Sequence, residues 1–256
     1  MKKPLTAAVL AAICLLTGWW VCRSYAAITA VSPVILQEGE KELPTIVIDA
    51  GHGGFDGGAV GVDGIVEKDI NLSIALKLYD LFTVNGFDAV LTRDSDISLH
   101  RQEDTTLRKK KNSDLHNRLA IASSYENAIL LSIHQNKFTQ SRFNGAQIFY
   151  GPKNEKSEPF AEIMQRRFIE MLQPENTRKY KKTGDSVFLI YNAPMPALLV
   201  ECGFLSNPEE AYQLIDAEYQ QKVAFTIFAG TMEYLGLEYE APLETSSESE
   251  EAQRIE

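Results

Sequence analysis

Short apolar runs alternate with longer amphipathic segments from Thr45 to Leu235. Short apolar runs are typical of strands in a sheet covered on both faces. In the longer segments the apolar residues recur every three or four positions, as in a helix. This alternation predicts an α/β layer fold. The predicted strands are residues 45–49, 88–92, 129–133, 146–150, 187–190 and 198–200, and the predicted helices are 69–85, 158–172 and 219–235.

The segment 94–114 breaks this alternation, because it is polar, charged and without a period. We expect it to be a surface insertion. Its basic run, Arg108 to Lys111, fits either a solvated loop or a surface that grips an anionic polymer. We find no internal repeat and no linker that would divide the region, so residues 45–237 are expected to form one domain.

The two ends of the chain have a different composition from this domain. Lys2 and Lys3 precede a nearly uncharged run that Arg23 closes, which predicts an export signal or a membrane anchor over residues 1–26. Residues 27–44 are expected to be a linker. Residues 238–256 are rich in Ser and Glu and are expected to form a disordered acidic tail. Any contact with a membrane would come only through the N-terminal segment.

Charge and cysteine content exclude two classes of protein. The 256-residue chain has a net charge of −10, whereas a nucleic-acid-binding protein normally has a basic surface. Two of its three cysteines, Cys14 and Cys22, lie in the predicted export segment. Cys202 is therefore alone in the predicted domain and cannot form a disulfide within it.

Polar residues that can carry chemistry follow three of the predicted strands. His52 lies shortly after the first strand, His134 directly follows 129–133, and Glu201 directly follows 198–200. Ligands of open α/β sheets bind beyond the carboxyl ends of the strands. We therefore expect these three side chains to converge on one site.

Glu67 is a fourth candidate. Extrapolated back from the helix at 69–85, it falls on the same side as Ile70 and Ile74, where an unpaired carboxylate would be very costly. The alternative is an exposed glutamate in the first turn, where it interacts favourably with the helix dipole. Position alone does not decide between the two.

Two histidines and a glutamate are a suitable ligand set for a catalytic zinc ion, which leaves a fourth position for water. Zinc lowers the pKa of its bound water from about 15.7 to about 7. A further carboxylate then takes the proton of the water and passes it to the leaving nitrogen, and Glu201 is the candidate for that role.

The surroundings of His52 separate it from the other histidines. It lies in the glycine-rich run 50–58, where the backbone can approach a bound group closely. The run is not a nucleotide loop, because a G-x-G-x-x-G pattern that starts at Gly51 would need glycine where Asp56 stands. His100 and His116 lie in or beside the polar insertion and are expected to be structural.

The chain resembles a known family at four places, which are IDAGHGG at 48–54, EKDINL at 67–72, SIHQN at 132–136 and VECGFLSN at 200–207. In the same order, these motifs are those of the zinc-dependent N-acetylmuramoyl-L-alanine amidases of the Amidase_3 family. The resemblance extends from Thr45 to Leu235. A short catalytic domain behind an export segment is most similar to the spore-cortex, germination-specific members.

The resemblance implies a three-layer α/β/α domain around a mostly parallel, twisted sheet. It also implies one zinc ion with a bound water, with His52, Glu67 and His134 as metal ligands and Glu201 as the catalytic glutamate. Arg118 matches a family arginine with a structural or substrate-positioning role. The chain departs from the family at Gln135, where alanine is usual, and at Cys202, where valine is usual.

The implied reaction is hydrolysis of the amide between N-acetylmuramic acid and L-alanine in peptidoglycan, outside the cytoplasm, during spore-cortex maturation. The sequence contains no recognisable wall-binding module, so an accessory protein is one way for the enzyme to reach the polymer. Two alternatives stay open: a cysteine-dependent wall peptidase that uses Cys202, and a wall-binding module without turnover.

Overall fold

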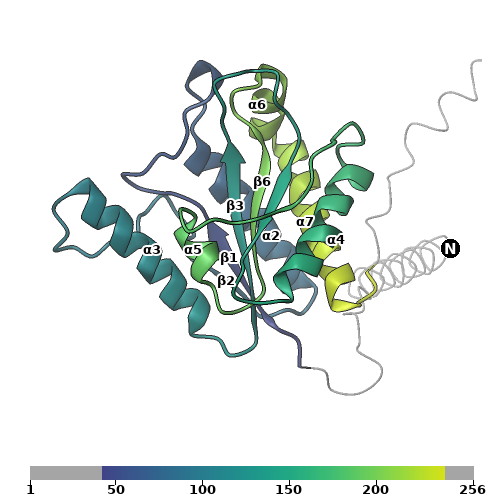
Figure 1. The fold of residues 1–256 in the computed structure, drawn as a ribbon, viewed down its shortest axis with the longest axis horizontal. Helices are drawn as coiled ribbons and strands as arrows, with labels where there is room; N and C mark the ends of the chain where they lie inside the picture. Colours follow the sequence, from purple (N-terminus) through teal and green to yellow (C-terminus); the bar gives the residue numbers. More distant parts are fainter. Residues whose placement is uncertain (1–41, 240–256) are drawn as a thin grey trace, which may run out of the picture. The chain divides into compact units, whose positions relative to one another are not determined.

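The computed structural model describes residues 42–239. The expected export segment, most of the expected linker and nearly all of the expected tail lie outside these residues. The elements are β1 (Thr45–Ala50), the 3-10 helix η1 (Val62–Gly64), α2 (Glu67–Val84), β2 (Ala89–Leu91), α3 (Leu107–Ser123), β3 (Ala128–Asn136), β4 (Gln147–Tyr150), α4 (Ser157–Met171), β5 (Lys181–Lys182), α5 (Phe188–Asn192), β6 (Ala197–Phe204), α6 (Pro208–Ile215) and α7 (Ala217–Leu235), as Figure 1 shows.

The strands form one six-stranded sheet in the order β2-β1-β3-β6-β4-β5. Neighbouring strands are parallel except β4 and β6, which are antiparallel. The expected mostly parallel sheet is confirmed.

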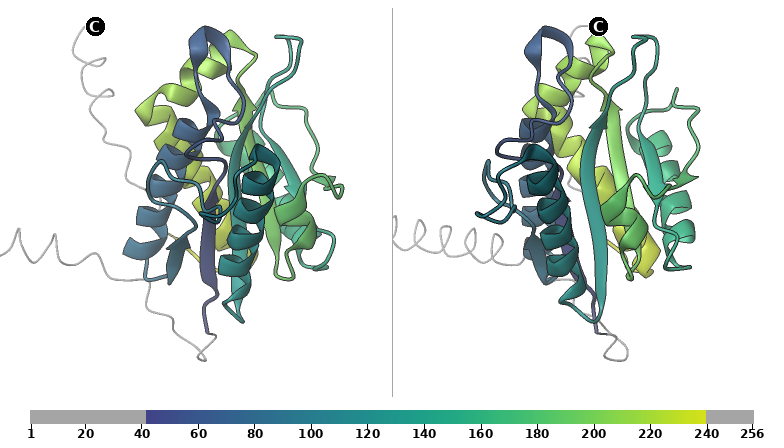
Figure 2. Two further views of the ribbon diagram at one scale, coloured as in Figure 1. Left: turned by 90° about the vertical axis from the view of Figure 1, so that its left-hand side faces the viewer. Right: turned by 60° about the vertical axis from the view of Figure 1, so that its left-hand side comes forward.

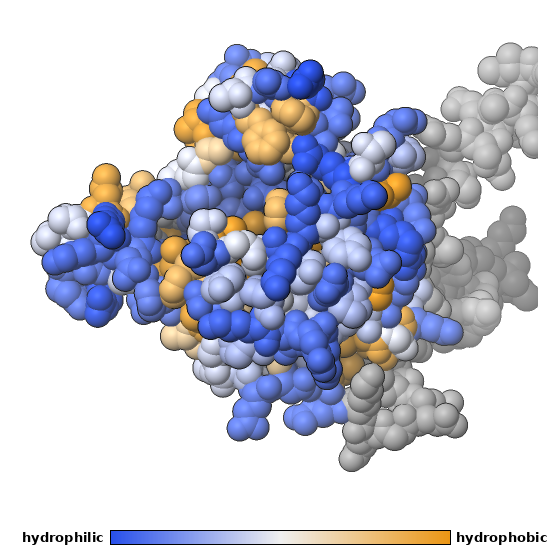
Figure 3. Space-filling view, in the orientation of Figure 1, coloured by the Kyte–Doolittle hydropathy of each residue, from blue (hydrophilic) through white to orange (hydrophobic). Residues whose placement is uncertain are grey.

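Helices cover both faces of this sheet (Figure 2). Along β3, Ile129 and Leu131 belong to the apolar core shared with α2, α4 and α7, whereas Leu130 belongs to a second core that also includes residues of α3 and α5. Successive strand residues point to opposite faces. The alternation therefore gives the expected three-layer α/β/α fold. In Figure 3 one face of the molecule is mostly hydrophilic, with hydrophobic residues in separate small groups.

Two predictions about elements are wrong. Residues 187–190 are not a strand, since residues 188–192 form helix α5. Nor is 94–114 entirely an insertion, because α3 begins at Leu107 and includes the whole basic run. Thr106 caps α3 by accepting a hydrogen bond from the Lys109 backbone N–H.

The central strands also extend further than predicted. β3 continues to Asn136 and β6 to Phe204, so His134 and Glu201 lie within strands rather than after them. The two strands pair with each other over this extension, with a register shift between His134 and Asn136. Within residues 42–239 no helix is both long enough and apolar enough to cross a membrane.

Candidate metal centre

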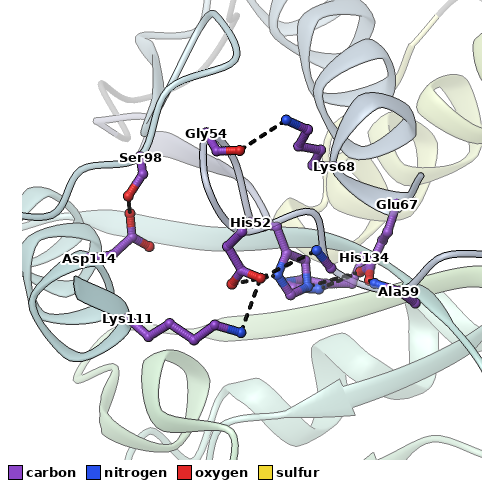
Figure 4. A network of polar contacts seen from close by, with 12 residues as sticks. His52, Gly54, Ala59, Glu67, Lys68, Ser98, Lys111, Asp114 and His134 are labelled. Carbon is purple, nitrogen blue, oxygen red and sulfur yellow. Dashed lines mark hydrogen bonds and ion pairs between the residues drawn. The ribbon is translucent and has the colours of Figure 1, made fainter. Parts of the chain in front are cut away.

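His52, Glu67 and His134 meet beyond the end of β1 (Figure 4). His52 lies in the loop after β1, Glu67 begins α2, and His134 lies in β3. His52 Nε2 is 3.3 Å and His134 Nδ1 is 2.9 Å from Glu67 Oε1. Within the described chain, the ligand atoms of these three residues lie within 4.8 Å of one another. The arrangement can hold a metal ion.

Glu67 points inward and is 3% exposed. Its Oε2 accepts a 2.7 Å hydrogen bond from the Ala59 backbone N–H, and its Oε1 accepts one of 3.1 Å from the Gln135 backbone N–H. Burial opposes the charged form, but the hydrogen bonds from His134 and His52 outweigh it and hold the pKa of Glu67 well below its usual range. The carboxylate is ionised, as a metal ligand must be.

His52 has an unusual backbone and a carboxylate partner. Its φ of 62° lies in the left-handed region, which non-glycine residues seldom adopt. Its Nδ1 is 3.0 Å from Asp56 Oδ2, and Nε2 faces Glu67. Burial lowers the pKa of His52, but hydrogen bonds to Asp56 and Glu67 more than reverse this and raise it to about 9. An ionised Asp56 can only accept, so it keeps a proton on Nδ1, and Nε2 faces Glu67, where a bound metal ion would take the place of the second proton.

Glu201 lies next to His134, since the two residues are direct partners in the β3–β6 register. It lines the same cavity as His52 and His134. Its Oε2 is buried without a hydrogen-bond partner among the described residues. Burial raises the pKa of Glu201 to about 7. A carboxyl with that pKa can exchange a proton near neutral pH.

The glycine-rich run lets the backbone pass close to these ligands. A Cβ on Gly51 would overlap the His134 imidazole, and one on Gly58 would lie 2.5 Å from Glu67 Oε2. Gly58 also has a φ of 71°, which favours glycine.

Two buried arginines donate hydrogen bonds to the backbone of this run. Arg118 donates to the carbonyls of Ala50 at 2.9 Å and of His52 at 2.6 Å. Arg93 donates to the carbonyls of Ala50 at 2.8 Å and of Gly51 at 3.0 Å. Arg118 also pairs with buried Asp49 at 2.7 Å. The structure thus gives Arg118 a structural role. Sequence reasoning missed Arg93, which lies outside any motif.

The cavity at this site has a volume of about 260 Å³ and is lined by His52, His134, Glu201 and residues of α3 and α5. Lys111 of the basic run is among its lining residues. A larger cavity of about 780 Å³ lies near the opposite ends of the strands, beside Pro44, Ala128 and Pro196. It contains none of the candidate site residues, so we assign the chemistry to the smaller one.

The remaining candidates lie away from the ligand cluster. His100 Nδ1 is 2.9 Å from the Ser98 hydroxyl, and His116 Nδ1 is 2.7 Å from the Asn112 carbonyl. Cys202 is fully buried in the core on the other face of the sheet, next along β6 from Glu201. Burial raises the pKa of the Cys202 thiol far above neutral. A thiol that is buried and protonated is not a nucleophile.

Comparison with known proteins agrees with the motifs. The Amidase_3 family model, described as N-acetylmuramoyl-L-alanine amidase, matches residues 46–232. A germination-specific N-acetylmuramoyl-L-alanine amidase of Bacillus subtilis is 36% identical over 189 residues, which cover 74% of this chain and 78% of the relative. The amidase LytC of the same organism is 31% identical over 74% of this chain and 35% of its own length.

Solved structures give the same result. The CwlD amidase from Clostridioides difficile, in complex with the GerS lipoprotein, superposes with a TM-score of 0.73 and 40% identity, over 75% of this chain and 98% of that one. The catalytic domain of CwlV from Bacillus (Paenibacillus) polymyxa superposes with a TM-score of 0.64 and 32% identity, over 77% of this chain and 100% of that one. With its fold, its motifs and these relatives in agreement, the chain belongs to the Amidase_3 family of N-acetylmuramoyl-L-alanine amidases.

Proposed function

We propose that this enzyme hydrolyses the amide between N-acetylmuramic acid and L-alanine in peptidoglycan with one zinc ion, held by His52, Glu67 and His134, and with Glu201 as general base and acid. The observation that carries the proposal is the buried, unpartnered Oε2 of Glu201 in the cavity of the ligand cluster. A buried carboxylate oxygen without a partner is costly unless a bound group or the reaction uses it.

The donor set fits zinc better than a harder cation. Two imidazole nitrogens and one carboxylate suit zinc, whereas calcium and magnesium prefer sets made of oxygens. When bound, zinc would supply a Lewis acid and a water of lowered pKa. Glu201, whose Oε2 is buried nearby, is not needed to complete the three-ligand set and is free for proton transfer.

The protein's own residues then perform three tasks. Asp56 and the two arginines fix the loop that carries His52. Glu201 accepts a proton at its carboxylate from the attacking water and donates it to the departing amine nitrogen. The raised pKa of Glu201 suits both steps, because such a group gains and loses a proton near neutral pH.

The test replaces Glu201 with glutamine, which has nearly the same shape but cannot act as an acid or a base near neutral pH. We expect Glu201→Gln to retain zinc and to lose turnover by about 10²-fold or more, the contribution of general acid–base catalysis. His134→Ala should instead lose most of the zinc, because two ligands hold the ion poorly. Elemental analysis and mass spectrometry of stem peptides released from peptidoglycan measure both effects. Unchanged hydrolysis by Glu201→Gln would contradict its role.

The alternative functions are less well supported. The position and protonation of Cys202 argue against a cysteine peptidase. A wall-binding module without turnover would not require the buried, unpartnered oxygen of Glu201. Inhibition by a zinc chelator, together with indifference to thiol reagents, would separate the amidase from the peptidase.

We propose that the enzyme acts outside the cytoplasm, in the cell wall or spore cortex, as the name of its germination-specific relative suggests. Residues 1–26 then direct export or anchor the chain, 27–44 are a linker, 45–237 are the catalytic domain, and 238–256 are a tail. An accessory protein brings it to the polymer, in keeping with the lipoprotein complex of the similar CwlD amidase. Muramic acid lacking its peptide in spores, lost when this enzyme is deleted, would support the cortex role.

A further inference from the structure

We infer that Lys111 is a positioning residue for the metal centre and acts on His52 through Asp56. The inference rests on the proposed metal site. It gives a role to one residue of the basic run. From the sequence alone, that run fitted either a solvated loop or a surface that binds an anionic polymer.

Asp56 links α3 to the imidazole of His52. One carboxylate oxygen, Oδ2, is 3.0 Å from His52 Nδ1, and the other, Oδ1, is 3.1 Å from the Lys111 ammonium nitrogen. The Gly58 backbone N–H is a weaker donor to Oδ1, at 3.4 Å. In Figure 4 the amino group of Lys111 points toward the ligand cluster. Lys111, Asp56 and His52 therefore form a chain of contacts that ends at a proposed ligand atom.

The chemistry of histidine gives this chain its effect. An imidazole that donates Nδ1–H to a carboxylate is fixed in orientation and tautomer, which directs Nε2 toward a metal and makes it more basic. Lys111 donates to the other oxygen of the carboxylate and restrains its rotation. Without the lysine, Asp56 keeps only the hydrogen bond to His52 and the long one from Gly58.

The neighbouring residues of α3 show that this end of the helix is docked on the loop. The Lys110 ammonium lies 5.6 Å from the centre of the Phe55 ring, next in sequence to Asp56. One turn further along, Asp114 accepts from the Leu99 backbone N–H at 2.6 Å. Lys109, by contrast, is exposed, and its side chain makes no ion pair within the part of the chain that the structure describes. It is a matched control on the same helix.

The experiment measures zinc affinity, by competition with a chromophoric chelator, for the full-length protein and its variants. We expect Asp56→Asn to weaken zinc binding by about 10- to 100-fold, as loss of a carboxylate partner of a liganding histidine does. Lys111→Met should weaken it by about twofold to fivefold, the range of a half-exposed ion pair. Lys111→Arg should restore affinity, and Lys109→Met should leave it unchanged.

A double variant separates positioning from bulk charge. If Lys111 acts through Asp56, Asp56→Asn with Lys111→Met should bind zinc no more weakly than Asp56→Asn alone. With the imidazole in its neutral form, the ring nitrogen chemical shifts of His52 in the metal-free protein should show a mixed tautomer in Asp56→Asn and Lys111→Met but not in Lys109→Met. A structural role limited to α3 would lower stability without changing these shifts.

Several results would contradict the role of Lys111. Equal zinc affinity of Lys111→Met and wild type, additive effects in the double variant, or the same loss in Lys109→Met would each overturn the inference. A raised KM with unchanged zinc affinity would assign Lys111 to the substrate instead, which also overturns it. Failure of the wild type to bind zinc would refute the proposed function itself, so the two failures are distinguishable.

Discussion

Arg118 is almost completely buried, and its guanidinium is shared by two carboxylates and two backbone carbonyls. It pairs with Asp49 at 2.7 Å and Asp114 at 2.6 Å, and it donates to the carbonyls of Ala50 and His52. Only the planar fork of an arginine offers that many donors in fixed directions. A buried charge with four partners is a strong constraint on the loop, because removing any partner leaves an uncompensated group.

Replacing Arg118 should lower the free energy of unfolding, because its buried carboxylate and carbonyl partners are left without a donor. We expect Arg118→Met to lower the free energy of unfolding by about 3–5 kcal/mol, the cost of breaking a buried ion pair. Arg118→Lys should lower the free energy of unfolding by less, since the lysine keeps the positive charge beside Asp49 and Asp114. Urea denaturation of the metal-free protein measures this. Lys222, which pairs with Glu218 at 2.8 Å on the surface, is the control, and Lys222→Met should leave the free energy of unfolding nearly unchanged.

The same ion pair gives a pH dependence. Burial opposes ionisation of Asp49, but Arg118 and Ser132 more than compensate and lower its pKa from 3.8 to about 2. The stability that comes from this depressed pKa is therefore complete above about pH 4 and is lost as the pH falls toward 2. The difference in melting temperature between wild type and Asp49→Asn should shrink in that window. A difference that stays constant down to pH 2 would contradict the assignment.

Single residues also mark where sequence reasoning succeeds and where it fails. His52, His134 and Glu201 were recognisable because each follows an apolar run that has no use for a polar side chain. Position alone left Glu67 undecided, since both a buried and an exposed glutamate fit the first turn of a helix. Arg93 gave no signal, because its partners are backbone carbonyls, and two of them lie some forty residues earlier in the chain.

At the scale of elements, the run of glycines between β1 and η1 passes between the metal ligands. Gly51 faces the His134 imidazole with no room for a methyl group, whereas a Cβ on Gly57 would meet only the Val66 side chain at 3.5 Å. The two glycines lie in one loop and differ in what surrounds them. They therefore form a matched pair for substitution.

We expect Gly51→Ala to abolish tight zinc binding, because the added methyl group displaces His134. Gly57→Ala should keep zinc affinity near that of wild type, since its contact is an ordinary one. Calorimetric titration of each variant with zinc provides the comparison. Similar zinc affinities for the two variants would show that His134 is not a ligand in the observed position.

Two of the helices that the sequence failed to predict, α3 and α5, have weak periodicity, whereas the third, α6, does not. Helix α3 buries Ser113, Arg118 and Ala122, so its inner face is partly polar and the apolar period is lost. Helix α5 is too short to show any period, and its apolar residues read equally well as a strand. Helix α6 did carry a signal, since Asn207 caps it and Pro208 occupies its first turn.

At the scale of the whole molecule, the packing of the described residues extends slightly beyond α7. The Tyr239 ring lies 5.8 Å from that of Phe225 and 5.9 Å from that of Phe228. Aromatic pairs at these distances contribute about 0.5–1.5 kcal/mol each. Tyr239, just past α7, therefore adds to the core between α2 and α7.

A chain that comprises residues 42–239 should fold, bind zinc and hydrolyse peptidoglycan fragments in solution. Ending the chain at residue 237 should lower its melting temperature by a few degrees, because roughly 1 kcal/mol shifts Tm by about 2–4 °C in a domain of this size. Circular dichroism and zinc titration of both chains test this. Equal melting temperatures would show that Tyr239 adds nothing.

Helix α3 makes ion pairs and hydrogen bonds to β1, to the loop after β1 and to the segment 98–101, whereas α2 and α7 bury broad apolar faces. Polar contacts of that kind form only after both partners are in position. We therefore expect α3 and the loop after β1, which carries His52, to become ordered together and late during folding. Backbone amides of α3 should then exchange with deuterium sooner than those of α7. The catalytic pocket would then be the last region to assemble during folding and the first to open when the protein is destabilised.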